Sequence, residues 1–143
     1  MEDEKLLSLF TDMARNHTSY VERRLQPLGI HAGQGAILTA LGEHGPCTQK
    51  ELAEYRRVSA ATISVMLRRM EKGGLIVRTA SNDGKGNRID LTDAGSRMYR
   101  ELARDRIGES ERMFAGLTAA ELSAAEKIFQ TISRNMEETN APK

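Results

Sequence analysis

The sequence is poor in the residues that build covalent or metal-bound frameworks. Of its 143 residues one is cysteine, Cys47, and the three histidines, His17, His31 and His44, are scattered. A single cysteine excludes an intrachain disulfide, and its spacing from the histidines matches no familiar metal site. A chain of this length can bury a hydrophobic core without a disulfide or a bound metal. We therefore expect a single domain in a reducing, intracellular compartment, with no metal or other cofactor.

Long apolar runs and catalytic groupings are lacking as well. The sequence has no run of about eighteen apolar residues, the length that spans a membrane. Residues 1–5 are mostly acidic and lack the basic and then apolar pattern of a secretion signal. No Ser-His-Asp or paired-carboxylate arrangement stands out. We therefore expect a cytoplasmic protein that is not an enzyme and has no membrane partner.

Charge is nearly balanced overall but is unevenly distributed. The formal net charge is +1, yet residues 56–88 contain eight basic and only two acidic residues. That window carries +6, and the rest of the chain carries −5. A basic centre between acidic ends suggests one anion-binding surface on a scaffold that polyanions do not attract. A solvated charged face would give the same count, so charge alone leaves both interpretations open.

Apolar residues recur at three- and four-residue spacing along most of the chain, which predicts helices. Glycine and proline residues fall at the expected breaks. Thr48 with Glu51, and Thr118 with Glu121, form predicted capping boxes, and Ser59 is a suitable N-cap. The predicted helices cover roughly residues 6–28, 32–43, 49–56, 60–72, 92–114 and 118–136.

The pattern changes after the fourth helix. Residues 75–78 and 88–91 favour strands, and the second run alternates polar and apolar residues. Turn-forming residues fill positions 82–87 between them, which predicts a β-hairpin. The expected fold is therefore mainly α with a small β-wing, a winged helix-turn-helix between longer terminal helices.

The helix that follows Ser59 has the side chains that a recognition helix needs at its reading end. In the major groove, the N-terminal residues of such a helix approach the base edges, where small and hydrogen-bonding side chains fit. Arginines one turn later meet the phosphate backbone instead. An ordinary capped surface helix is the alternative. The predicted DNA contacts are Thr48, Gln49, Ser59, Ala60, Ala61, Thr62, Ser64, Val65, Arg68 and Arg69.

The predicted hairpin supplies a second basic element. Lys85 and Arg88 project from a glycine-rich turn, and a cation on such a tip can enter an adjacent minor groove. Asp83 would repel phosphate if it were free, so we expect it to pair with Lys85 or Arg88 and to orient that side chain. A solvated hairpin without DNA contact is the alternative.

In this order and spacing, the central and C-terminal segments resemble the MarR family of bacterial winged-helix regulators. The resemblance covers nearly the whole chain. It implies a single domain with a winged helix-turn-helix at 32–92, flanked by dimerisation helices at 1–28 and 93–140. The matching segments are Thr48–Ala53 (TQKELA), Val58–Ser64 (VSAATIS), Met70–Arg78 (MEKGGLIVR), Leu91–Gly95 (LTDAG) and Met113–Thr118 (MFAGLT) followed by Glu121.

The resemblance also implies partners and a mode of regulation. Proteins of this family form homodimers whose two recognition helices enter successive major grooves of palindromic double-stranded DNA. They usually repress transcription, and many leave DNA when a small aromatic, often phenolic, effector binds. Met13, His17 and Tyr20 lie on or beside the apolar stripe of the first helix and are candidates to line the effector pocket. A packed interface histidine is the alternative for His17.

Three positions depart from the family pattern. Lys85 stands in the wing where arginine is usual, and lysine lacks the bidentate fork of arginine. Ala60 follows the serine cap, where relatives often have a basic residue. Gly35 replaces a bulky apolar residue, which would enlarge a pocket or loosen the second helix. The missing wing arginine supports the alternative function, a protein-interaction module that no longer binds DNA.

Cys47 is the remaining candidate for special chemistry. Some proteins of the family sense oxidants through cysteine, and the helix that begins after Cys47 would lower its pKa. Sensing cysteines usually lie near the N-terminal helix instead. An ordinary loop thiol is therefore the preferred interpretation.

Overall fold

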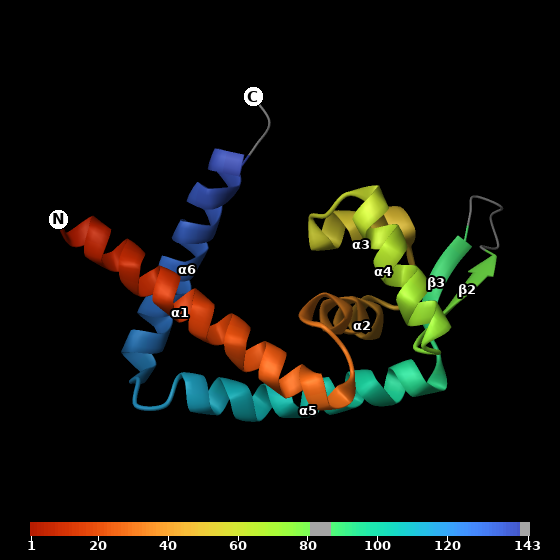
Figure 1. The fold of residues 1–143 in the computed structure, drawn as a ribbon. Helices are drawn as coiled ribbons and strands as arrows, with labels where there is room; N and C mark the ends of the chain where they lie inside the picture. Colours follow the sequence, from red (N-terminus) through yellow and green to blue (C-terminus); the bar gives the residue numbers. More distant parts are fainter. Residues whose placement is uncertain (81–86, 141–143) are drawn as a thin grey trace. The chain divides into compact units, whose positions relative to one another are not determined.

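The computed structural model describes residues 1–80 and 87–140, which form helices and one small sheet (Figure 1). Residues 1–103 form one compact unit, and a second begins at residue 104, within the fifth α-helix. The predicted class, mainly α with a small β-wing, is confirmed. In chain order the elements are α1 (Glu2–Leu25), the 3-10 helix η1 (Gln26–Leu28), α2 (Ala32–His44), β1 (Cys47–Thr48), α3 (Gln49–Arg56), α4 (Ala60–Lys72), β2 (Ile76–Ala80), β3 (Asn87–Leu91), α5 (Asp93–Met113) and α6 (Ala119–Asn140).

Side-chain caps mark the starts of several helices. Thr118 and Glu121 form both bonds of the predicted capping box before α6, at 3.2 and 2.8 Å. At α3 only half of the predicted box forms: the Glu51 amide donates to the Thr48 hydroxyl at 3.1 Å. The return bond from Thr48 to the Glu51 carboxylate is absent from the described residues, where Thr48 ends a strand instead.

The sheet has three antiparallel strands in the order β1-β3-β2. Strands β2 and β3 pair from Ile76 opposite Leu91 to Ala80 opposite Asn87, which confirms the predicted hairpin. Strand β1 is not predicted by the sequence, because the two residues Cys47–Thr48 are too few to show alternation. Pairing with β3 defines this strand, and it leads directly into α3.

The core of residues 1–103 is built mainly from α2, α3, α4 and the sheet, with Leu25 of α1 and Leu102 of α5 at its edge. The large buried side chains come from the apolar faces of their elements. Burying one leucine, isoleucine or methionine side chain contributes about 1.5–3 kcal/mol to the free energy of folding. The core therefore fixes α4 and the hairpin to one scaffold. The large, fully buried side chains are Ile37, Leu38, Leu41, Leu52, Ile63, Leu67, Met70, Ile76 and Ile89.

Gly35 does not open a pocket, contrary to the sequence-based expectation. It is buried in α2, and a Cβ at this position would lie 3.4 Å from Leu25 Cδ1 and 3.9 Å from Leu102 Cδ1. These are ordinary contact distances, so Leu25 and Leu102 already occupy the volume that a larger side chain would take. Helix α2 continues through this position without a break.

The first half of α5 packs closely on the rest of its unit. A Cβ at Gly42 of α2 would lie 2.5 Å from the Tyr99 ring, and a Cβ at Gly95 would overlap the Leu75 carbonyl oxygen. A side chain at either position would therefore clash with its neighbour unless that neighbour moved. Farther along α5, the Leu102 carbonyl accepts a hydrogen bond from Arg24 Nη2 of α1 at 3.1 Å.

The unit from residue 104 onward contains the second half of α5 and all of α6. Helix α6 has 22 residues, and none of them is buried. Its exposed large apolar side chains are Leu122, Ile128, Phe129, Ile132 and Met136. Among residues 1–80 and 87–140, no helix has the length and apolarity needed to cross a membrane.

Candidate nucleic-acid interface

Helices α3 and α4 form a helix-turn-helix (Figure 1). Arg57 ends α3 in the left-handed conformation (φ 53°, ψ 44°), and its amide donates to the Glu54 carbonyl at 3.1 Å. Val58 completes the turn by donating to the Ala53 carbonyl, also at 3.1 Å. Ser59 then caps α4, which confirms the predicted N-cap.

Helix α4 has one buried face and one exposed face. Ile63, Leu67 and Met70 are at most 1% exposed and fix the helix on the core. The predicted contact residues of α4 lie mainly on the other side, because most of them are one or two residues from an anchor and therefore about 100–200° around the helix from it. Ser64 is half-buried, and the exposed members of the set are Ser59, Ala60, Ala61, Thr62, Val65, Arg68 and Arg69.

The hydroxyls of Ser59 and Thr62 are linked at the start of α4. Ser59 Oγ accepts from the Thr62 amide at 3.1 Å and donates to Thr62 Oγ1 at 2.9 Å. The proton of Ser59 is therefore used inside the protein. The Thr62 hydroxyl keeps its own proton, so this exposed group faces solvent as a hydrogen-bond donor.

Arg68 and Arg69 form the basic part of the exposed α4 face. Arg68 Nε donates to the Ser64 carbonyl at 3.4 Å, within the same helix. Neither arginine has a carboxylate partner in the described part of the chain. Both charges are therefore available to a polyanion, one to two turns beyond the small residues at the start of the helix.

The structure places Arg88 differently from the sequence-based expectation. Asp83 and Lys85 lie outside the described residues. Arg88 is exposed but belongs to strand β3, opposite Thr48 on one side and Thr79 on the other. Its Nη1 donates to the Pro46 carbonyl at 3.2 Å. Arg88 therefore does not project from the turn, because β3 begins one residue before it.

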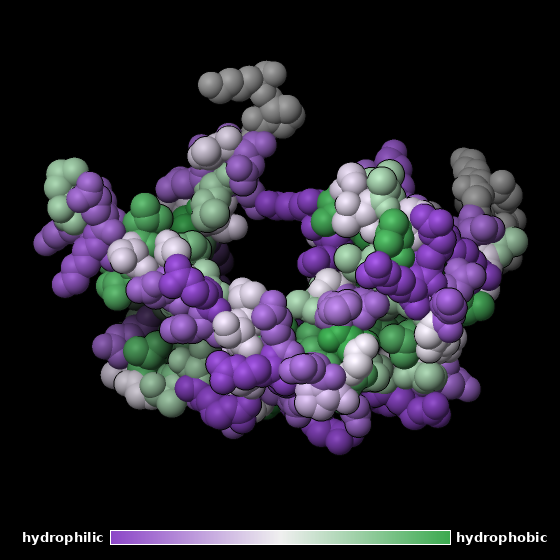
Figure 2. Space-filling model, viewed as in Figure 1, coloured by the Kyte–Doolittle hydropathy of each residue, from purple (hydrophilic) through white to green (hydrophobic). Residues whose placement is uncertain are grey.

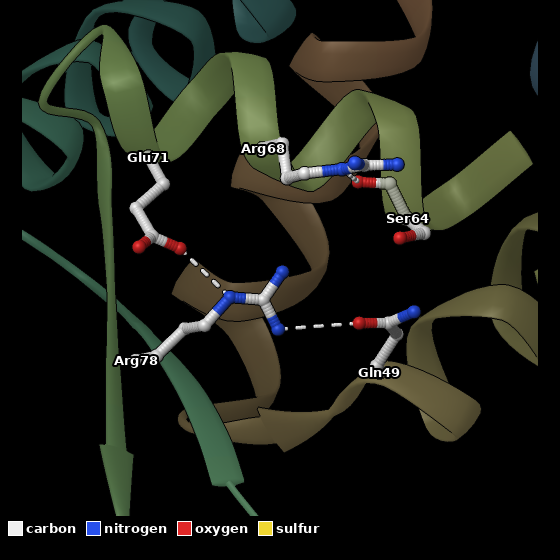
Figure 3. A network of polar contacts seen from close by, with 5 residues as sticks. All are labelled: Gln49, Ser64, Arg68, Glu71 and Arg78. Carbon is white, nitrogen blue, oxygen red and sulfur yellow. Dashed lines mark hydrogen bonds and ion pairs between the residues drawn. The ribbon is translucent and has the colours of Figure 1, made fainter. Parts of the chain in front are cut away.

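Arg78 is a functional candidate that the sequence-based reasoning missed. Its Nε donates to Glu71 Oε2 at 2.7 Å, and its Nη1 donates to Gln49 Oε1 at 3.2 Å. Figure 3 shows its guanidinium between the side chains of Glu71 on α4 and Gln49 on α3. Strand alternation is the signal that could have found it, because Arg78 shares its face of β2 with the buried Ile76.

Cys47 is a buried strand residue, which corrects its interpretation as a loop thiol. It is 8% exposed, and its Sγ donates to the Gly45 carbonyl at 3.3 Å. Burial raises the pKa of the thiol, the carboxylates of Glu51 and Asp90 raise it further, and Arg88 opposes them. The expected lowering by the helix that follows is therefore wrong, because loss of hydration dominates.

An open cavity lies where α1, η1 and the start of α2 meet. Its volume is about 830 Å³, and its lining includes Ser19, Glu22, Arg23 and His31. The predicted effector residues Met13, His17 and Tyr20 all lie on α1, and none of them lines this cavity.

Known proteins share both the sequence pattern and the fold. A model of the MarR family matches residues 30–86. The organic hydroperoxide resistance transcriptional regulator of Bacillus subtilis is 33% identical over 104 residues, which cover 72% of this chain and 70% of that protein. The HTH-type transcriptional repressor IacR of Pseudomonas putida is 24% identical over 129 residues, 87% of this chain and 77% of that protein. The crystal structure of Streptococcus pneumoniae FabT in complex with DNA covers 96% of this chain and 99% of its own, with a TM-score of 0.88 at 18% identity, and so shares the fold.

Proposed function

The chain belongs to the MarR family of DNA-binding transcriptional regulators, and we propose that it is a homodimeric repressor that a small aromatic molecule releases from a palindromic operator. As a member of this family it is a regulator and not an enzyme. The exposed basic face of α4 is the observation that carries the proposal. Repression is supported by relatives such as IacR, which is named a repressor. We expect it to act in the cytoplasm, where its operator lies.

We propose that α4 lies in the major groove with its N-terminus toward the bases. The small residues Ala60 and Ala61 allow close approach, and Thr62 supplies a donor. Arg68 and Arg69 then meet phosphates, as do the opening amides of α3 next to Thr48 and Gln49. The remaining proposed contacts are Ser59, Ser64 and Val65 from α4, and Lys85 and Arg88 from the wing, with Asp83 as the residue that orients the wing cation.

Exposed apolar faces support the homodimer. In α1, which has 24 residues, Leu25 is the only buried one, whereas Leu6, Leu7 and Leu9 are each more than half exposed. Helix α6 buries none of its residues. Figure 2 shows green, apolar side chains at the surface of these terminal segments. A second copy of the chain would cover such faces, which a monomer would leave in water. We therefore assign residues 1–28 and 93–140 to dimerisation.

A binding assay tests the DNA-binding part of this proposal. Fluorescence anisotropy against the DNA upstream of the protein's own gene should show tight binding that weakens steeply with salt. Arg68→Ala should weaken binding to every duplex and lower the slope of log K against log[salt] by about 1, since one phosphate contact is lost. Arg15→Ala, at an exposed residue of α1 that lies outside the nucleic-acid interface, is the charge-matched control. Absence of any salt-sensitive binding would sink the proposal.

The cavity beside η1 supports the effector part. Its volume of about 830 Å³ suits a small molecule, and Arg23 and His31 in its lining can donate to a carboxylate or phenolate. Hydroxybenzoates should release the protein from DNA, and Arg23→Gln should raise the concentration required. Arg15→Gln, on the same helix but outside the cavity, should leave that concentration unchanged. Release that is equally sensitive in both variants would place the effector elsewhere, for example near Met13, His17 and Tyr20.

A further inference from the structure

Arg78 joins three elements of the DNA-binding part. It lies on β2, in the middle of the paired stretch, where it is opposite Ile89 of β3. From there its Nε reaches Glu71 in the last turn of α4 at 2.7 Å, and its Nη1 reaches Gln49, the first residue of α3, at 3.2 Å (Figure 3). One side chain therefore connects the wing to both helices of the helix-turn-helix.

The chemistry of the guanidinium makes this connection directional. Its donors lie in one rigid plane, so two acceptors on different elements are held at a fixed angle. A lysine ammonium at this position would have no such plane and a shorter reach. Gln49 follows directly after the Thr48 cap, so a bond to its side chain also restrains the start of α3.

Its ion pair distinguishes Arg78 from Arg68 and Arg69, the two arginines that we propose bind phosphate. Its charge is paired with the Glu71 carboxylate, and its side chain is 26% exposed. Arg68 and Arg69, in contrast, are exposed and have no carboxylate partner among the described residues. A paired, half-buried cation adds little to the attraction of a polyanion, but its two bonds restrain the residues that hold it.

We propose that Arg78 is a positioning residue for DNA binding, which holds Gln49 and the wing in register with α4 and does not itself contact phosphate. The inference rests on the proposed function, because it assumes that α3, α4 and the wing meet DNA together. Its consequence is that the Glu71–Arg78–Gln49 bonds affect how well the protein discriminates between DNA sequences. They leave unchanged the number of phosphates that it neutralises.

The test compares specific and non-specific binding of the full-length chain. The probes are the duplex that the unchanged protein selects from a random-sequence pool and a scrambled duplex of equal length. Arg78→Gln should lose about tenfold in affinity for the selected duplex, a size typical of residues in one hydrogen-bond network, with an unchanged salt slope. Arg78→Lys should not restore the affinity, because one ammonium cannot hold both acceptors at the required angle. Glu71→Gln should weaken selected binding by a similar factor.

A double-mutant cycle with Gln49→Ala provides the decisive readout. If Arg78 acts through Gln49, the double variant should bind the selected duplex about as well as the weaker single variant. Losses that multiply, full rescue by Arg78→Lys, or a lower salt slope for Arg78→Gln would each overturn the inference. Thermal unfolding of each variant confirms that it is folded, and Glu71→Gln keeps the test available if Arg78→Gln is not. Failure of the unchanged protein to select any duplex would instead refute the proposed function.

Discussion

At the scale of single residues, the hydroxyl of Thr62 is the group most open to a sequence-specific contact. Because Ser59 donates to it, at 2.9 Å, the proton of this exposed hydroxyl is left free to donate to another group. In the major groove, a donor favours a base that presents an acceptor at its position, such as guanine O6 or thymine O4, over a base that presents an amino group there. The role of Thr62 is therefore discrimination more than attraction.

Thr62→Val tests this role, because valine keeps the branched shape and removes the donor. Affinity for the preferred duplex should fall by about 1–3 kcal/mol, the value of one base contact, with little change for other sequences. Thr62→Ser keeps the donor and should retain the preference. The measurement is competition among duplexes that differ at single base pairs. Equal losses on all duplexes would assign the hydroxyl to phosphate instead.

Cys47 leads to a second prediction at this scale. Its burial, and the raised pKa that follows, keep the thiol protonated at neutral pH, so little of the reactive thiolate exists. Iodoacetamide should label the native protein much more slowly than the unfolded chain. Mild peroxide treatment should leave DNA binding unchanged. Rapid labelling of the native protein, accompanied by loss of DNA binding, would instead make Cys47 a redox switch.

At the scale of elements, contact between helices α2 and α5 depends on a missing side chain. A Cβ at Gly42 would lie 2.5 Å from the Tyr99 ring, so Gly42→Ala must displace that ring. We expect a loss of about 1–3 kcal/mol in the free energy of unfolding, the usual cost of overpacking. Urea denaturation followed by circular dichroism measures it.

Gly108→Ala is the matched control for that substitution. Gly108 also lies in a helix, α5, but its added methyl would meet only the end of the Arg112 side chain, at 3.3 Å. Alanine there should stabilise the chain by up to about 1 kcal/mol through its higher helix propensity. Combining Gly42→Ala with Tyr99→Ala should remove most of the Gly42→Ala penalty. A penalty that persists would assign the cost to another neighbour.

The elements themselves were largely predictable, because helices and hairpins depend on local patterns. The caps at Thr48 and Ser59 and the hairpin at 75–91 follow from residue types and spacing. Strand β1 and the contacts of Arg78 did not follow, because both depend on residues distant in the chain. Cys47 was misassigned for the same reason: its burial arises from packing that no local pattern records.

At the scale of the whole molecule, the basic residues and the exposed apolar residues are concentrated in different parts of the chain. The basic window at 56–88 coincides with α4 and the wing, which form part of the first unit. Most of the exposed large apolar residues lie on the terminal helices instead. Because a palindrome requires two recognition helices at a fixed spacing, DNA binding should also depend on residues of the terminal helices that are not part of the basic surface.

Phe129→Lys on α6 tests that dependence. Phe129 is 45% exposed within the isolated chain, and in a symmetric dimer the change occurs twice. We expect the dimer to be destabilised by roughly 3 kcal/mol in total, about a hundredfold in its Kd, with affinity for palindromic DNA falling in parallel. Light scattering and anisotropy measure the two quantities. Gln130→Lys adds the same charge at the next residue, about 100° around the helix from Phe129 and away from the apolar stripe, and should leave both unchanged. A Phe129→Lys protein that stays dimeric, or that binds the palindrome as a monomer with full affinity, would show that α6 does not hold the two recognition helices together.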